Sequence, residues 1–103
     1  MSWIYLVAAG LLEVVWAYYM KQSEGFTRLV PTSITVVAMI ASFALLALAM
    51  RTLPLSTAYT VWTGIGAVGA FIIGTFVLGE PVNAMRIAAA VLITAGLVLM
   101  KLS

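Results

Sequence analysis

The side chain best placed to do chemistry in this sequence is the carboxylate of Glu13. It lies near the middle of a run that is otherwise apolar from Trp3 to Met20. A charged group at the centre of a bilayer costs several kcal/mol, so an acidic residue at that depth is by default a functional site. The alternative is a structural acid paired with a base in another helix. No Lys or Arg lies in the interior of an apolar run, so the sequence favours a functional role for Glu13.

Residues three or four positions from Glu13 share its face of a helix, which places Gly10 and Trp16 beside it. Gly10 leaves room for another group to approach. Trp16 offers an indole N–H that can donate a hydrogen bond to a carboxylate. We therefore expect these two residues to shape the surroundings of the acid.

The second apolar run contributes one polar residue near mid-membrane, Ser42, with Met39 one turn before it and Phe43 beside it. A serine in a membrane helix often bonds only to its own backbone, so Ser42 alone is a weak indication. The third run carries Tyr59 and Trp62 on one face. These rings are either part of an interfacial aromatic belt or, since Trp62 is about 9 Å deep, part of the site.

A carboxylate with aromatic faces and hydroxyl groups around it is a cation site, because the rings offer cation–π contacts and the hydroxyls offer hydrogen bonds. The third run also contains closely spaced glycines. Gly66 and Ala70 have the spacing of close helix packing, and the cluster Gly64, Gly66 and Gly69 would alternatively allow a bend. The fourth run has neither a central charge nor an aromatic residue, so we interpret it as a packing or dimerisation surface.

The composition indicates an all-α integral membrane protein. Hydrophobic residues make up 65% of the 103 residues and charged residues 8%, against about half and about a quarter in soluble domains. Four apolar runs, approximately 3–20, 31–50, 56–78 and 84–101, are each close to the ~20 residues of a spanning helix. We expect one four-helix transmembrane domain over residues 1–103.

The sequence contains neither cysteine nor histidine, so we expect no disulfide, no metal site and no cofactor. The basic residues are scattered and give a net charge of +2, which is too sparse for nucleic-acid binding. The breaks between runs contain helix-ending and helix-capping residues. Gly25 is a natural stop, Ser56 or Thr57 can cap the third helix, and Asn83 can cap the fourth. Such short loops predict antiparallel neighbours, with both termini on one side.

The basic residues are nearly balanced between the two sides of the membrane. Lys21, Arg28 and Arg86 fall on one side, and Arg51 and Lys101 on the other. Orientation follows the Lys/Arg excess of cytoplasmic loops, so near balance predicts insertion in both directions. Four helices have little room for a water-filled cavity, and the two orientations permit an antiparallel homodimer. The alternative is a fixed orientation set by one or two dominant charges.

Across its whole length the chain resembles the small multidrug resistance (SMR) family. The matching features are Glu13 followed by Trp16 and Lys21, the loop Gly25-Phe26-Thr27-Arg28, and the motif Ala58-Tyr59-x-x-Trp62-Thr63-Gly64. Within the family it resembles the guanidinium-exporter (Gdx, or SugE-like) branch. The branch markers are Gly10, Trp16, Met39 and the run Trp62-Thr63-Gly64-Ile65-Gly66-Ala67. One difference is the pair Tyr18-Tyr19, which replaces residues that are more often small or aliphatic; a ring from this pair in the cavity would change the substrate range.

The resemblance implies a dual-topology, antiparallel homodimer in the bacterial inner membrane that exchanges protons for guanidinium-type cations. Glu13 would be the shared site for proton and substrate. The resemblance implies that the residues around it are Gly10, Trp16, Ser42, Tyr59 and Trp62. It also implies that Met39 and Phe43 line a side portal between the two copies of the second helix.

We therefore expect a proton-coupled antiporter, and not an enzyme, that exports guanidinium and small substituted guanidinium cations by alternating access. Quaternary ammonium ions with one thin tail are expected as further substrates. One alternative is a broad multidrug or quaternary ammonium exporter of the same family. Another is a non-transporting assembly protein whose Glu13 docks a basic helix of a partner, and a third is a passive cation channel.

Overall fold

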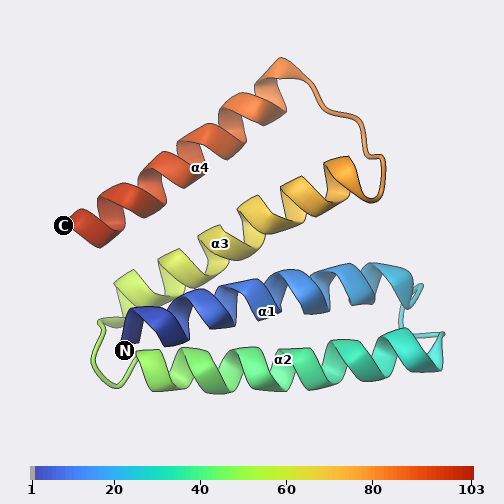
Figure 1. Ribbon diagram of the computed structural model, residues 1–103, viewed down its shortest axis with the longest axis horizontal. Coiled ribbons are helices and arrows are strands. Elements are labelled where there is room, and N and C mark those ends of the chain that lie inside the picture. Colours follow the sequence, from blue (N-terminus) through green and yellow to red (C-terminus); the bar gives the residue numbers. More distant parts are fainter. Residues whose placement is uncertain (1) are drawn as a thin grey trace.

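The computed structural model describes residues 2–103, which form four long helices joined by short loops (Figure 1). The helices are α1 (Ser2–Gln22), α2 (Leu29–Ala49), α3 (Leu55–Phe76) and α4 (Ala84–Leu102). Each is long and apolar enough to cross a membrane. The prediction of four spanning helices is confirmed, and the observed ends lie within about two residues of the expected ones.

The helices lie side by side in the order α2, α1, α3, α4, and each runs antiparallel to the helix that follows it in sequence (Figure 1). Both termini lie at one end, as predicted from the short loops (Figure 1). The principal extents are 40 × 35 × 16 Å. The shortest extent is little more than the diameter of one helix, about 10–12 Å, so the four helices form a layer rather than a closed bundle.

The core lies where α1, α2 and α3 meet, in the half of the layer nearest the termini. Small residues at this junction allow the helix backbones to approach closely. The buried cluster consists of Leu6, Ala9, Leu46, Ala49, Ala58, Val61 and Trp62. In contrast, the backbone of α4 lies close to α3 alone, with Lys101 reaching the Trp3 ring of α1 at 5.2 Å. None of the α4 residues in the range 84–102 is buried. Its apolar surface is therefore left uncovered by this chain.

Two glycines of α3 receive side chains from the helices on either side. The position that a side chain at Gly64 would take is filled by Leu97 of α4, and the same position at Gly69 is filled by Val14 of α1. Close packing of the small residues of α3 is thus observed. Helix α3 is continuous from Leu55 to Phe76.

The predicted cap of α4 is confirmed, but the predicted cap of α3 is wrong. Asn83 accepts a hydrogen bond from the backbone N–H of Arg86 at 2.9 Å. Helix α3 instead begins after Pro54, whose carbonyl accepts the first helical bond, so Ser56 and Thr57 lie inside the helix. The fixed φ of proline, −62° here, suits the start of a helix, which therefore begins two or three residues earlier than a cap at Ser56 or Thr57 would place it.

The turn after α1 uses Gly25, as predicted, although the helix has already ended at Gln22. Glu24, Gly25 and Phe26 all have positive φ, between 51° and 74°. The buried Ser23 holds this turn together, because its hydroxyl donates to Met20 O and accepts from the backbone N–H of Phe26. The tight turn brings α2 back alongside α1.

Asn83→Ala should loosen the first turn of α4. The substitution removes the acceptor of the Arg86 N–H, and a lost N-cap costs about 1 kcal/mol, equivalent to roughly fivefold faster exchange of that amide. Hydrogen exchange measured by mass spectrometry on the purified protein checks this. Ser56→Ala is the matched control and should leave exchange in the first turn of α3 unchanged; a comparable acceleration there would contradict the Pro54 cap.

Candidate functional site

The carboxylate of Glu13 lies at the middle of α1 and points to α3, against Gly66. A side chain built on Gly66 would meet the Oε1, Cδ and Cγ atoms of Glu13, so the acid occupies that space itself. Within residues 2–103, Oε1 is buried and has no hydrogen-bond partner. The predicted absence of a basic partner inside the helices therefore leaves the carboxylate with an unsatisfied acceptor.

Trp16 lies one turn beyond Glu13 on the same helix, as the spacing predicted. Its indole Nε1 is also buried without a hydrogen-bond partner in the described part of the chain. The hydrogen bond that we expected between the two side chains is thus not formed in this structure. The Trp16 ring is directed to α2 and lies 6.5 Å from the ring of Phe43, centroid to centroid.

Ser42 joins three helices through its hydroxyl group. It is fully buried, donates a hydrogen bond to Ala9 O of α1 at 2.7 Å, and accepts one from Trp62 Nε1 of α3 at 3.0 Å. The interpretation of Ser42 as a serine that bonds only its own helix is therefore wrong. An indole N–H and a hydroxyl in the membrane need hydrogen-bond partners, and here the two groups are partners of each other.

Four aromatic rings form a continuous row across the same three helices. The ring of Phe43 lies 5.5 Å from that of Trp62, which lies 5.7 Å from that of Tyr59. Trp16 extends the row at its other end through Phe43. Trp62 is only 6% exposed, so it is not part of an interfacial belt, whereas Tyr59 is 52% exposed and lies at the open edge of the row.

The remaining predicted residues have different surroundings. Gly10 is buried, and the group that approaches it is the side chain of Ile65 from α3, so it provides a packing contact rather than open space. Met39 is half-buried one turn before Ser42, and Phe43 is 47% exposed. The rings of Tyr18 and Tyr19 pack edge to face against each other, 5.1 Å apart.

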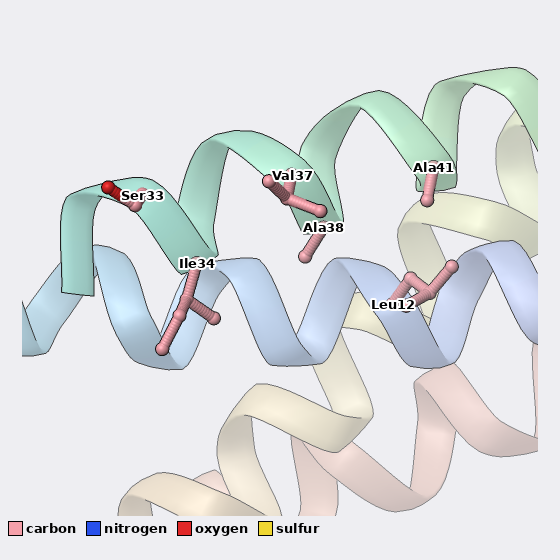
Figure 2. Close-up of a pocket in the computed structure, with 6 residues that line it drawn as sticks. All are labelled: Leu12, Ser33, Ile34, Val37, Ala38 and Ala41. Carbon is pink, nitrogen blue, oxygen red and sulfur yellow. The ribbon is translucent and has the colours of Figure 1, made fainter. Parts of the chain in front are cut away.

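The groove shown in Figure 2 is not lined by Glu13. It has a volume of about 380 Å³ and is bounded by Leu12 of α1 on one side and by residues of α2 on the other. The α2 residues are Ser33, Ile34, Val37, Ala38 and Ala41. Its one hydroxyl, that of Ser33, already donates to Leu29 O, so the groove is apolar and unsuited to a cation.

Together these side chains can bind a proton or a cation. Glu13 supplies a carboxylate for a proton or a cation. The aromatic row, which begins at Trp16 one helical turn from Glu13, supplies π faces. The Ser42 bridge fixes the buried ring of Trp62. Two contributors were missed at the level of sequence, the carbonyl of Ala9 and the space above Gly66, because a backbone group and a missing side chain leave no pattern to find.

Comparison with known proteins identifies the family of the chain. A family model described as Small Multidrug Resistance protein matches residues 1–93. The chain is similar to a guanidinium exporter of Escherichia coli strain K12, with 62% identity over 103 residues that cover 100% of this chain and 98% of the relative. It is 59% identical, with the same coverage, to guanidinium exporters of Citrobacter freundii and Salmonella typhimurium. The chain therefore belongs to the small multidrug resistance family.

Proposed function

We propose that this protein exports guanidinium and small substituted guanidinium cations in exchange for protons. It is a multi-pass protein of the bacterial inner membrane, as its four spans and its enterobacterial relatives indicate. The relatives named guanidinium exporter match it over its full length. The observation that carries the proposal is the carboxylate of Glu13, which lies within a spanning helix and has a buried oxygen without a partner in residues 2–103. The role is that of a transporter and not of an enzyme.

The chemistry of the substrate suits these groups. Guanidinium is planar and permanently charged, and it presents N–H donors in a fork that matches carboxylate oxygens. Its flat faces stack on aromatic rings, and Trp16, Tyr59 and Trp62 offer such rings around Glu13. A proton and a cation that use the same carboxylate exclude each other. A site that is exposed alternately to the two sides of the membrane then exchanges one for the other.

We further propose that the working unit is an antiparallel homodimer. A layer 16 Å thick gives one copy no closed chamber around Glu13, and the apolar surface of α4 is left uncovered. The near balance of basic residues supports insertion in both orientations. A second copy would add a second Glu13 to the site, and two like charges that interact strongly titrate as a coupled pair. Met39 and Phe43 would lie where the two copies of α2 meet, as a side portal for a thin alkyl tail.

Proteoliposomes test this proposal against its alternatives. The purified protein should carry guanidinium uphill when a pH gradient is imposed, and it should need no other protein to do so. Guanidinium flux that dissipates its own gradient but ignores the pH gradient would identify a channel. No flux in any condition would favour the assembly protein. Equal transport of guanidinium and of bulky aromatic cations would favour the broad multidrug exporter.

Glu13→Gln should abolish guanidinium binding and reduce transport to the level of protein-free liposomes, because it removes the charge and preserves the shape. Glu13→Asp should retain binding with an altered pH dependence, since the acid remains but is shorter by one methylene. Currents recorded from proteoliposomes on a solid support measure both. Transport by Glu13→Gln at the level of the unmutated protein would contradict the proposed site.

Adding one or two lysines at the C-terminus should bias insertion to one orientation and lower the activity of that variant expressed alone. The physical reason is that a Lys/Arg excess is retained in the cytoplasm. Co-expression with an oppositely biased variant should restore activity. The protein has no cysteine of its own, so single cysteines introduced into the loops of the otherwise unmutated protein report the orientations by their accessibility. A single orientation would contradict the antiparallel dimer.

Trp16→Gly should shift preference to bulky aromatic cations, because it removes a large ring beside Glu13. Ser42→Ala should weaken guanidinium binding more than tetra-alkylammonium binding, by roughly five- to tenfold, because it removes the hydrogen bond that holds the Trp62 ring on which the flat cation would stack. Ser33→Ala is the matched control, since its hydroxyl bonds only within α2. Isothermal titration with both cations measures these ratios. Equal loss for the two cations in Ser42→Ala would show that the hydroxyl only holds the helices together.

A further inference from the structure

The glycine at position 66 does more in this structure than let two helices approach. Gly66 is buried on α3, and the group that fills the space of its missing side chain is the carboxylate of Glu13. At Gly69, one turn further along α3, the corresponding space is filled by the apolar side chain of Val14. Two glycines on the same helix thus receive two different kinds of group from α1.

The contact at Gly66 separates the two oxygens of the carboxylate. A Cβ atom at Gly66 would lie nearest to Oε1, then to Cδ, and then to Cγ at 2.9 Å, so Oε2 lies farther from this position than Oε1 does. Oε1 is the oxygen that is buried without a partner in the described part of the chain. The glycine therefore lets Glu13 lie against the α3 backbone, with Oε1 in the space of the missing side chain and Oε2 farther from it.

We infer that Gly66 is a positioning residue of the transport site, which sets the depth and direction of the Glu13 carboxylate; this rests on the proposed function of that carboxylate. With only a hydrogen at position 66, the acid lies against α3 and presents Oε2 to a cation. A methyl group at this position would push the carboxylate off the helix. A misplacement of about 1 Å in a binding constellation can cost on the order of a hundredfold in rate.

We expect the Gly66→Ala variant to fold. The atoms in the way belong to the end of a flexible side chain, which can rotate without moving a backbone. The core cluster that joins α1, α2 and α3 contains neither residue. The expected consequence is a displaced carboxylate in an intact helix layer, not a disrupted chain.

Gly66→Ala should raise the KM for guanidinium by about tenfold or more, with a changed pH profile of transport. Gly69→Ala is the matched control, because it inserts the same methyl between the same two helices but against Val14. It should alter thermal stability without changing the KM. Transport currents give the KM and the pH profile, and circular dichroism during heating gives the stability. A KM and pH profile of Gly66→Ala equal to those of the unmutated protein would overturn the inference.

A double-mutant cycle with Glu13→Asp separates positioning from packing. Aspartate is shorter by one methylene and reaches less far into the space at position 66, so in that background Gly66→Ala should change the KM by a smaller factor than it does with Glu13. Equal effects of Gly66→Ala in the two backgrounds would show a purely structural glycine. If Gly66→Ala alone does not fold, the double variant with Glu13→Asp and Gly66→Ala tests the inference. Its folding and transport would support the inference, and its failure would overturn it.

The two proposals fail in different ways. If the unmutated protein does not carry guanidinium, the proposed function is wrong. If it does carry guanidinium while Gly66→Ala and Gly69→Ala behave alike, the function stands and the positioning role of Gly66 is wrong. The unmutated protein and both glycine variants are therefore measured in the same liposome preparation.

Discussion

The whole arrangement depends on one constraint, that a polar group within a membrane needs a partner. The interior of this chain meets that constraint nearly everywhere. The hydroxyl of Ser42 and the indole of Trp62 satisfy each other, and Ser42 also satisfies Ala9 O. The exceptions in residues 2–103 are Glu13 Oε1 and Trp16 Nε1, which lie one helical turn apart. The Glu13 carboxylate is thus unpaired among buried polar groups that have partners. A cation or a proton can stabilise it there.

The helix layer serves this carboxylate in two ways. Small residues bring α1 close to α3, so that Glu13 lies directly on the α3 backbone at Gly66. The Ser42 bridge fixes Trp62 within the aromatic row across α1, α2 and α3, with Trp62 buried and Tyr59 at the open edge. The layer of four helices is too thin to enclose the site. The second copy that we propose would cover the apolar surface of α4 and add its own Glu13, so that two acids rather than one would couple proton and cation.

The sequence alone predicted the helices well, because twenty-residue apolar runs have few alternatives in a membrane. It also identified Glu13, since a charge in such a run is conspicuous, and the neighbours of Glu13 on the same helix follow from periodicity. The sequence did not predict the contacts between helices. Ile65 at Gly10, Ala9 O at Ser42 and Glu13 at Gly66 depend on how helices are rotated against each other. The start of α3 was misplaced because Pro54 and Ser56 both carry start signals, and the conformational constraint of proline prevailed over the hydroxyl.

Competition between proton and guanidinium for one carboxylate is the centre of this account, and the most direct measurement of it is proton release on binding. Guanidinium is added to the purified protein in weakly buffered detergent solution, and the protons that appear are counted by a pH electrode across a series of starting pH values. The account predicts that binding displaces protons wherever the protein holds them, with a stoichiometry that falls as the starting pH rises. Guanidinium binding with no release of protons at any starting pH would show that the two ligands occupy different places, and would contradict the account.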